Sequence, residues 1–232
     1  MTASPSDRQL IADACRILSG EGLAELFTGH VSTLVGDGHF LIPVHLHGDG
    51  RGMESITPEL VFEVDANGDP LEADAPEPPE EVVIHSEVLK RRDDVTSVVH
   101  AHPTYATGLS AAEEEIKPAT LDANVFNGSV PVHDPGPKLL YTEEDGQALA
   151  EDLGEKGAVL IRGHGVVTVG ETVTESVARM WIVERAAQLQ VIANQAGGVS
   201  AFPEGFDPGF LRGETDRPFE AVFKFLRRKH VD

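Results

Sequence analysis

The chain of 232 residues is long enough for one sizeable domain, and its 41% hydrophobic content is typical of a globular protein rather than a disordered one. Acidic residues outnumber basic ones by 39 to 18, so the formal net charge is −21. A negative field of this size repels phosphate backbones and anionic lipid surfaces. We therefore expect neither nucleic acid nor membrane as a partner, and expect a small-molecule substrate instead.

The single cysteine, Cys15, excludes an intramolecular disulfide and a thiolate-rich metal site. Its neighbours Leu10, Ile11, Ala14 and Leu18 predict a buried core thiol. The first ten residues lack the basic and apolar pattern of a leader, and no segment approaches the ~18 uninterrupted apolar residues of a membrane span. We expect a cytoplasmic protein.

The first half of the chain predicts two helices and several strands. Apolar positions 10, 11, 14, 15 and 18 share one helical face, and Ser6 or Asp7 can cap that helix. The predicted elements are a helix over 6–19, a strand over 39–44, a loop over 43–55, a strand–turn–strand over 60–74, an extended connector over 73–81, and a helix over 80–94.

The second half alternates strands with helices. Thr142 is a good N-cap for a helix whose first turn is acidic, and Gly197 and Gly198 end a long amphipathic helix. The predicted elements are strands over 95–102 and 128–134, a helix over 142–154, two strands within 157–170, and helices over 172–198 and 217–230. This interleaving favours α/β or mixed layering around one sheet.

His100 and His102 lie two residues apart in an apolar run. On a strand they point to the same face, about 7 Å apart from two residues of ~3.3 Å rise, so both imidazoles can converge on one ion. Zinc accepts such nitrogen ligands, and catalytic sites use three protein ligands with one open position. The alternative is a pair of hydrogen-bonded core histidines.

Two further residues could complete a site. His164 stands between two glycines, which let the backbone turn sharply and a ligand approach the ring, although a histidine in a tight turn is the alternative. Glu81 precedes His85 by four residues at a helix start. It is a candidate metal ligand or acid/base group, or a first-turn acid that complements the helix dipole.

Together these segments resemble the class II aldolase/adducin family. The resemblance rests on 78–103 followed by 158–170, with support from 28–32, 55–60 and 184–193, and it covers about 8–200. We expect one domain over 1–232, with 201–232 as a C-terminal extension. The resemblance implies a three-layer α/β/α fold with a central, mainly antiparallel sheet.

The resemblance also implies a site and an assembly. His100, His102 and His164 match the family's ligands for a divalent metal, which is usually zinc, with manganese or another divalent ion as alternatives. Glu81 matches the glutamate that ligates the resting metal and serves as acid/base. Family aldolases are cyclic homotetramers with active sites at subunit interfaces, so a homo-oligomer is implied here.

The sequence departs from the phosphate-binding pattern of the family's sugar-phosphate aldolases. His30 replaces an Asn, and Pro79 and Glu80 replace a Ser pair. A glutamate repels a phosphate dianion, so we expect a non-phosphorylated substrate. Substrate contacts are expected from Gly29, His30, Ser32 and Arg51, although a solvated loop is the alternative for Arg51 and for His45 and His47.

The expected function is a divalent-metal-dependent carbon–carbon lyase, either an aldolase or a decarboxylase. It would act on a small oxo- or hydroxy-carboxylate through an enolate whose charge the metal stabilises. The alternatives are a sugar-phosphate aldolase or epimerase of the same family, or a non-catalytic, adducin-like interaction module. Retention of the three histidines and Glu81 favours the enzyme.

The acidic surface suggests adaptation to a high-salt cytoplasm, with an ordinary acidic mesophilic protein as the alternative. If the adaptation is real, added potassium chloride should raise the thermal unfolding temperature measured by circular dichroism, because salt screens the self-repulsion of the folded state. Full folding and activity in dilute buffer would count against the hypothesis.

Overall fold

One seven-stranded sheet forms the centre of the molecule. The computed structural model describes residues 4–26, 28–46, 50–71, 75–126, 128–203, 206 and 217–231. The strands lie in the order β3-β2-β1-β4-β7-β6-β5, and every neighbouring pair is antiparallel except the parallel pair β5 and β6. Their bounds are β1 His30–Gly36, β2 His39–Pro43, β3 Val61–Val64, β4 Ser97–Ala101, β5 Val132–His133, β6 Ala158–Ile161 and β7 Gly165–Gly170.

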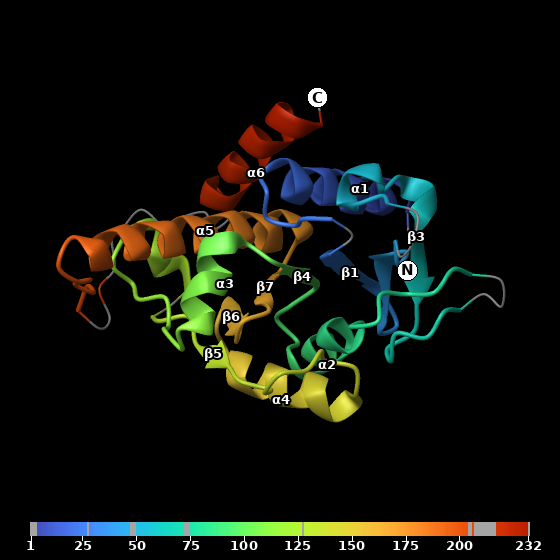
Figure 1. Ribbon diagram of the computed structural model, residues 1–232. Helices are drawn as coiled ribbons and strands as arrows, with labels where there is room; N and C mark the ends of the chain where they lie inside the picture. Colours follow the sequence, from blue (N-terminus) through green and yellow to red (C-terminus); the bar gives the residue numbers. More distant parts are fainter. Residues whose placement is uncertain are drawn as a thin grey trace.

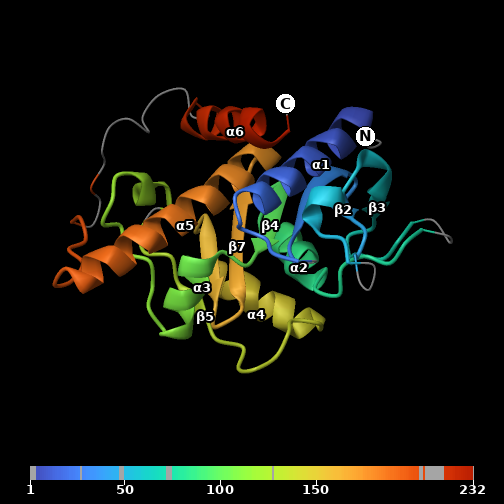
Figure 2. The same ribbon diagram turned by 45° about the horizontal axis from the view of Figure 1, so that its top comes forward.

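Helices cover both faces of this sheet (Figures 1 and 2). The α-helices are α1 Pro5–Gly20, α2 Val83–Arg91, α3 Thr104–Ala111, α4 Glu143–Leu153, α5 Val173–Gln195 and α6 Arg217–His230. Three short 3₁₀ helices cover Met53–Ser55, Pro58–Leu60 and Asp122–Phe126. Helices α1, α3, α5 and α6 lie on one face, and α2 and α4 lie on the other (Figure 1).

Each face of the sheet has its own hydrophobic core. Val98 and Val99 are neighbours on β4, yet Val98 packs with α2 and α4 whereas Val99 packs with α1 and α5. Successive side chains of a strand point to opposite faces, and burial on both sides explains the continuous apolar runs of the central strands. The predicted three-layer α/β/α arrangement is therefore confirmed.

The helix boundaries follow local capping chemistry. Thr142 caps α4 as predicted, and its hydroxyl accepts a hydrogen bond from the Asp145 amide. The predicted cap of α1 is wrong, because Ser4 and Asp7 form a capping box and Pro5 occupies the first helical turn. The predicted bounds of α6 are confirmed, and those of α5 agree to within three residues.

Other expectations need correction. Strand β1 and helix α3 were not predicted, and α2 is shorter at both ends than the expected 80–94. The expected strand after the turn at 65–69 is a single bridge between Val64 and Pro70, because proline has no amide hydrogen for a ladder. Within the described ranges, no helix has both the length and the apolar character needed to cross a bilayer.

The capping box of α4 can be tested directly. Replacement of Thr142 by Ala should lower the free energy of unfolding in urea by about 1 kcal/mol, because the amide of Asp145 loses its acceptor. Thr142→Ser keeps the hydroxyl and is the matched control. Equal destabilisation by both variants would show that the cap is not responsible.

Candidate metal centre and pocket

The three central strands bring distant histidines to one end of the sheet. His30 on β1 lies directly opposite His100 on β4, and His100 lies opposite Val167 on β7. His164 directly precedes β7, in the turn from β6. His102 follows β4, where its amide donates a hydrogen bond of 3.0 Å to the carbonyl of Leu23.

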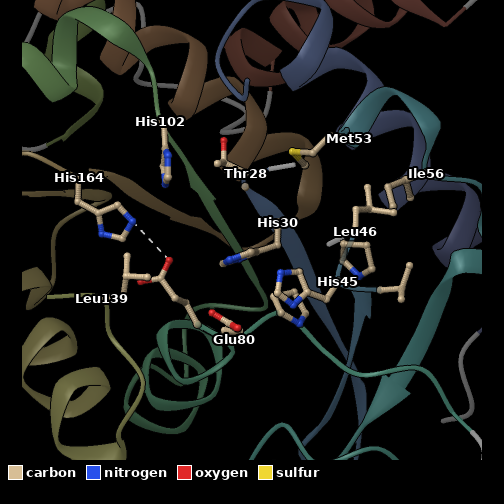
Figure 3. A pocket seen from close by; sticks show the side chains of 15 residues that line it. Thr28, His30, His45, Leu46, Met53, Ile56, Glu80, His102, Leu139 and His164 are labelled. Carbon is tan, nitrogen blue, oxygen red and sulfur yellow. Dashed lines mark ion pairs between the residues drawn. The ribbon is translucent and has the colours of Figure 1, made fainter. Parts of the chain in front are cut away.

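The rings of His100, His102 and His164 surround a common point. Their centroids are 4.8–5.0 Å apart, and the Nε2 atoms of His100 and His102 are separated by 3.1 Å. Two ligands of a tetrahedral zinc ion are about 3.3 Å apart when each Zn–N bond is about 2.0–2.1 Å. Figure 3 shows His102 and His164 directed toward one space. The geometry therefore suits one ion.

The hydrogen bonding of these rings also fits a metal. The Nδ1–H of His100 donates to the carbonyl of Val166 at 3.1 Å, so its Nε2 is the nitrogen that faces the other rings. Both ring nitrogens of His164 are buried without a hydrogen-bond partner in the part of the chain that the structure describes. Buried polar atoms normally have partners, and an ion would supply one here.

The glycines beside His164 are required by this packing. A Cβ atom on Gly165 would lie 2.6 Å from both the carbonyl oxygen of Ala101 and Cδ2 of His102. Gly163 has a φ of +62°, in the left-handed region that favours glycine. The Gly-His-Gly segment thus lets His164 approach the other two rings.

Glu81 lies at the edge of the histidine cluster, in the turn before α2. Its Oε2 is 3.4 Å from Nε2 of His164 and 3.6 Å from Nε2 of His100, while Oε1 accepts a hydrogen bond of 3.0 Å from the amide of Leu140. Burial alone would raise the pKa of Glu81, but His100 and His164 outweigh it and hold the pKa well below its usual range. Glu81 is therefore ionised.

His102 is better suited to bind a cation than to be one. Burial, reinforced by His100 and His164, lowers the pKa of His102 to about 3. The site thus combines a neutral imidazole ligand with a carboxylate in a largely buried space. Such a donor set fits a divalent cation, which would balance the buried charge of Glu81.

A cavity of about 140 Å³ opens beside this cluster (Figure 3). One side carries Glu81, His30, His102 and His164, and much of the rest is apolar. The apolar lining residues are Pro43, Val44, Leu46, Met53, Ile56, Pro79 and Leu139. Gly29 also lines the cavity with a φ of +93°, and a Cβ there would lie 2.9 Å from Sδ of Met53.

The structure brings most of the predicted site residues together. Glu81, His102, His164, Gly29 and His30 line the cavity, and a ligand atom of His100 lies within 4.8 Å of ligand atoms of Glu81, His30, His102 and His164. Ser32 is fully buried and does not reach the cavity. Arg51 is exposed and does not line it, whereas His45 does; His47 lies outside the described residues.

Sequence reasoning missed two features of the site. Nε2 of His85 lies 2.6 Å from Nδ1 of His30, a contact that the sequence does not indicate. The amide of Leu140, which holds Glu81, carries no sequence signal because it belongs to a loop far along the chain. The apolar spacing of 82–89 indicates only that His85 is buried, and not which side chain it contacts.

Comparisons with known proteins identify the family of this chain. Residues 9–191 match the family model of the class II aldolase and adducin N-terminal domain. A 3,4-dihydroxyphthalate decarboxylase of Terrabacter sp. is 35% identical over 227 residues, covering 90% of this chain and 93% of that protein. An L-fuculose phosphate aldolase of Methanococcus maripaludis is 26% identical, covering 78% and 93%.

A solved structure supports the fold. An L-fuculose 1-phosphate aldolase superposes with a TM-score of 0.78 and 21% identity, covering 97% of this chain and 98% of that chain. At that identity the likeness concerns the fold alone.

The donor set predicts one tightly held divalent ion per chain. His102→Ala should abolish stoichiometric binding in elemental analysis of purified protein, because two imidazoles remain. His39→Ala is the matched control, since His39 pairs with Glu63 on the far part of the sheet and does not line the cavity. An unchanged ion content in His102→Ala would remove this residue from the metal site.

Proposed function

The chain belongs to the class II aldolase and adducin family and is an aldolase-type lyase, and from that premise we propose that it is a metal-dependent decarboxylase of a hydroxylated aromatic acid. The observation that carries this proposal is a mainly apolar cavity, one aromatic ring in size, beside a cluster of histidines and a carboxylate. The decarboxylase relative supports it, since the two chains match over almost their full lengths.

The size of the cavity supports a single ring. Its volume of about 140 Å³ compares with the ~150 Å³ of an engineered apolar cavity that binds benzene in another protein. Leu46, Met53 and Ile56 offer apolar surface to the ring. The polar end, with His30 and Glu81, would receive the carboxylate and the neighbouring hydroxyl groups of the substrate.

His100, His102 and His164 would hold the divalent ion, with zinc and manganese as the leading candidates. When bound, the ion would act as a Lewis acid toward negative charge that develops on substrate oxygens. The position of Glu81 beside these ligands leaves its Oε2 available for proton transfer.

Glu81 would move the proton that decarboxylation requires. Its Oε2 would accept the proton of a ring hydroxyl and return it to the ring carbon that bears the carboxylate. Cleavage of the carbon–carbon bond then releases carbon dioxide, and the bonding pair restores the aromatic ring. Solvent supplies the net proton consumed. The amide of Leu140 fixes the other oxygen, Oε1, and so orients the carboxylate.

The rim of the cavity argues against a phosphorylated substrate. Pro79 and Glu80 line it, and Glu80 is exposed there. A carboxylate at this position repels a phosphate dianion, and proline offers no amide hydrogen to bind one. We therefore extend the proposal to a non-phosphorylated acid.

The remaining expectations rest on the family and on composition. We propose a homotetramer, the assembly implied by the family resemblance, with the sites near subunit interfaces. A cytoplasmic location and adaptation to high salt follow from the sequence features described above and belong to the same proposal.

The reaction can be tested with the zinc- and manganese-loaded protein. With 3,4-dihydroxyphthalate as probe, carbon dioxide should be released without an aldehyde, while L-fuculose 1-phosphate should give no product. Glu81→Gln should retain the ion but lower kcat by at least about a hundredfold, because proton transfer is lost. The matched control is Glu63→Gln, which alters a carboxylate of β3 that pairs with His39.

Two results would contradict the proposal. Aldehyde release from the sugar phosphate without carbon dioxide from any aromatic acid would assign an aldolase. Equal loss of activity in Glu63→Gln and Glu81→Gln would show that Glu81 has no special role in proton transfer.

A further inference from the structure

We propose that Ser32 and His85 are positioning residues that keep the hydrogen of the His30 ring on Nε2, which makes His30 a hydrogen-bond donor to the substrate carboxylate and excludes it as a metal ligand. The identity of the acceptor rests on the proposed function. The tautomer of His30 and its exclusion from the metal site do not.

The three side chains form a buried chain of hydrogen bonds. Oγ of Ser32 lies 2.6 Å from Nδ1 of His85, and Nε2 of His85 lies 2.6 Å from Nδ1 of His30. His30 and Ser32 are two residues apart on β1, so both point to the face of the sheet that α2 covers. His85 on α2 fits between them.

Proton counting gives the direction of these bonds. An imidazole ring has a hydrogen on at least one of its nitrogens, and Nε2 of His85 and Nδ1 of His30, which are 2.6 Å apart, share a single hydrogen. Within the described chain, His85 is the hydrogen-bond partner of the Ser32 hydroxyl. This hydroxyl is fully buried, so its hydrogen needs the ring as acceptor.

One arrangement satisfies every group. The hydroxyl of Ser32 donates to Nδ1 of His85, Nε2–H of His85 donates to Nδ1 of His30, and the hydrogen of His30 therefore resides on Nε2. The opposite direction would leave the buried hydroxyl hydrogen of Ser32 without an acceptor. His30 thus presents an N–H to the cavity that it lines.

This arrangement also decides between two possible metal sites. Ligand atoms of His100, His102 and His164 lie close enough to hold an ion, but so do those of His30, Glu81 and His100. A protonated nitrogen has no lone pair for a metal, and Nδ1 of His30 is occupied by His85. The first set therefore binds the ion, and His30 is left for an oxygen acceptor.

The test compares Ser32→Ala and Ser32→Thr in the zinc-loaded protein. Nitrogen NMR of labelled histidines should show hydrogen on Nε2 of His30 in the wild type and in Ser32→Thr, and a mixture of tautomers in Ser32→Ala. His30→Ala assigns the signal and should keep one zinc ion per chain. Thr168→Val is the matched control, since it removes a fully buried hydroxyl on β7 that donates to the Ser176 carbonyl.

Binding measurements address the acceptor. Ser32→Ala should weaken binding of phthalate by about threefold to tenfold, the loss expected for one hydrogen bond, while binding of catechol, which has no carboxylate, stays unchanged. Ser32→Thr should restore phthalate binding. Thr168→Val should leave both affinities unchanged.

Three results would overturn the inference. They are hydrogen on Nδ1 of His30 in the wild type, loss of zinc from His30→Ala, and equal phthalate affinity in wild type and Ser32→Ala. Failure to release carbon dioxide from any aromatic acid would overturn the proposed function instead, because the NMR signal and the zinc content do not depend on turnover.

Discussion

Backbone hydrogen bonds between β1, β4 and β7 hold the candidate site together. They place His30 opposite His100 and bring the start of β7, with His164 just before it, beside the end of β4. Side chains that are far apart in the sequence therefore meet without relying on a flexible loop. Because a one-residue slip would turn His100 to the opposite face of the sheet, the register of these strands determines the candidate site as well as the fold.

The electrostatics of the cluster follow from the same burial. Desolvation keeps His30, His85 and His102 neutral, whereas Glu81 stays ionised. The neutral imidazole of His102 and the carboxylate of Glu81 together favour a bound cation. The amide of Leu140 adds a fixed donor to this carboxylate, so that its second oxygen remains directed at the histidines.

Much of the architecture could be predicted because it depends on local signals. The caps of α4 and α5 and the apolar periodicity of each helix are set by residues close together in the sequence. The His-x-His and Gly-His-Gly segments likewise indicate candidate ligands at strand ends. Strand β1 was missed because its β-branched run overlaps the glycine loop of the family resemblance. The contact of His85 with His30 depends on how α2 packs on β1, which no local pattern reports.

The origin of the cavity walls has a consequence for the choice of substrate. The histidines belong to the sheet and its immediate ends, whereas most of the apolar wall comes from connections around 43–56, 79 and 139. Loops tolerate substitution and changes of length far better than central strands. Changes in these connections can therefore reshape the cavity and its choice of substrate while the histidines of the sheet stay in place.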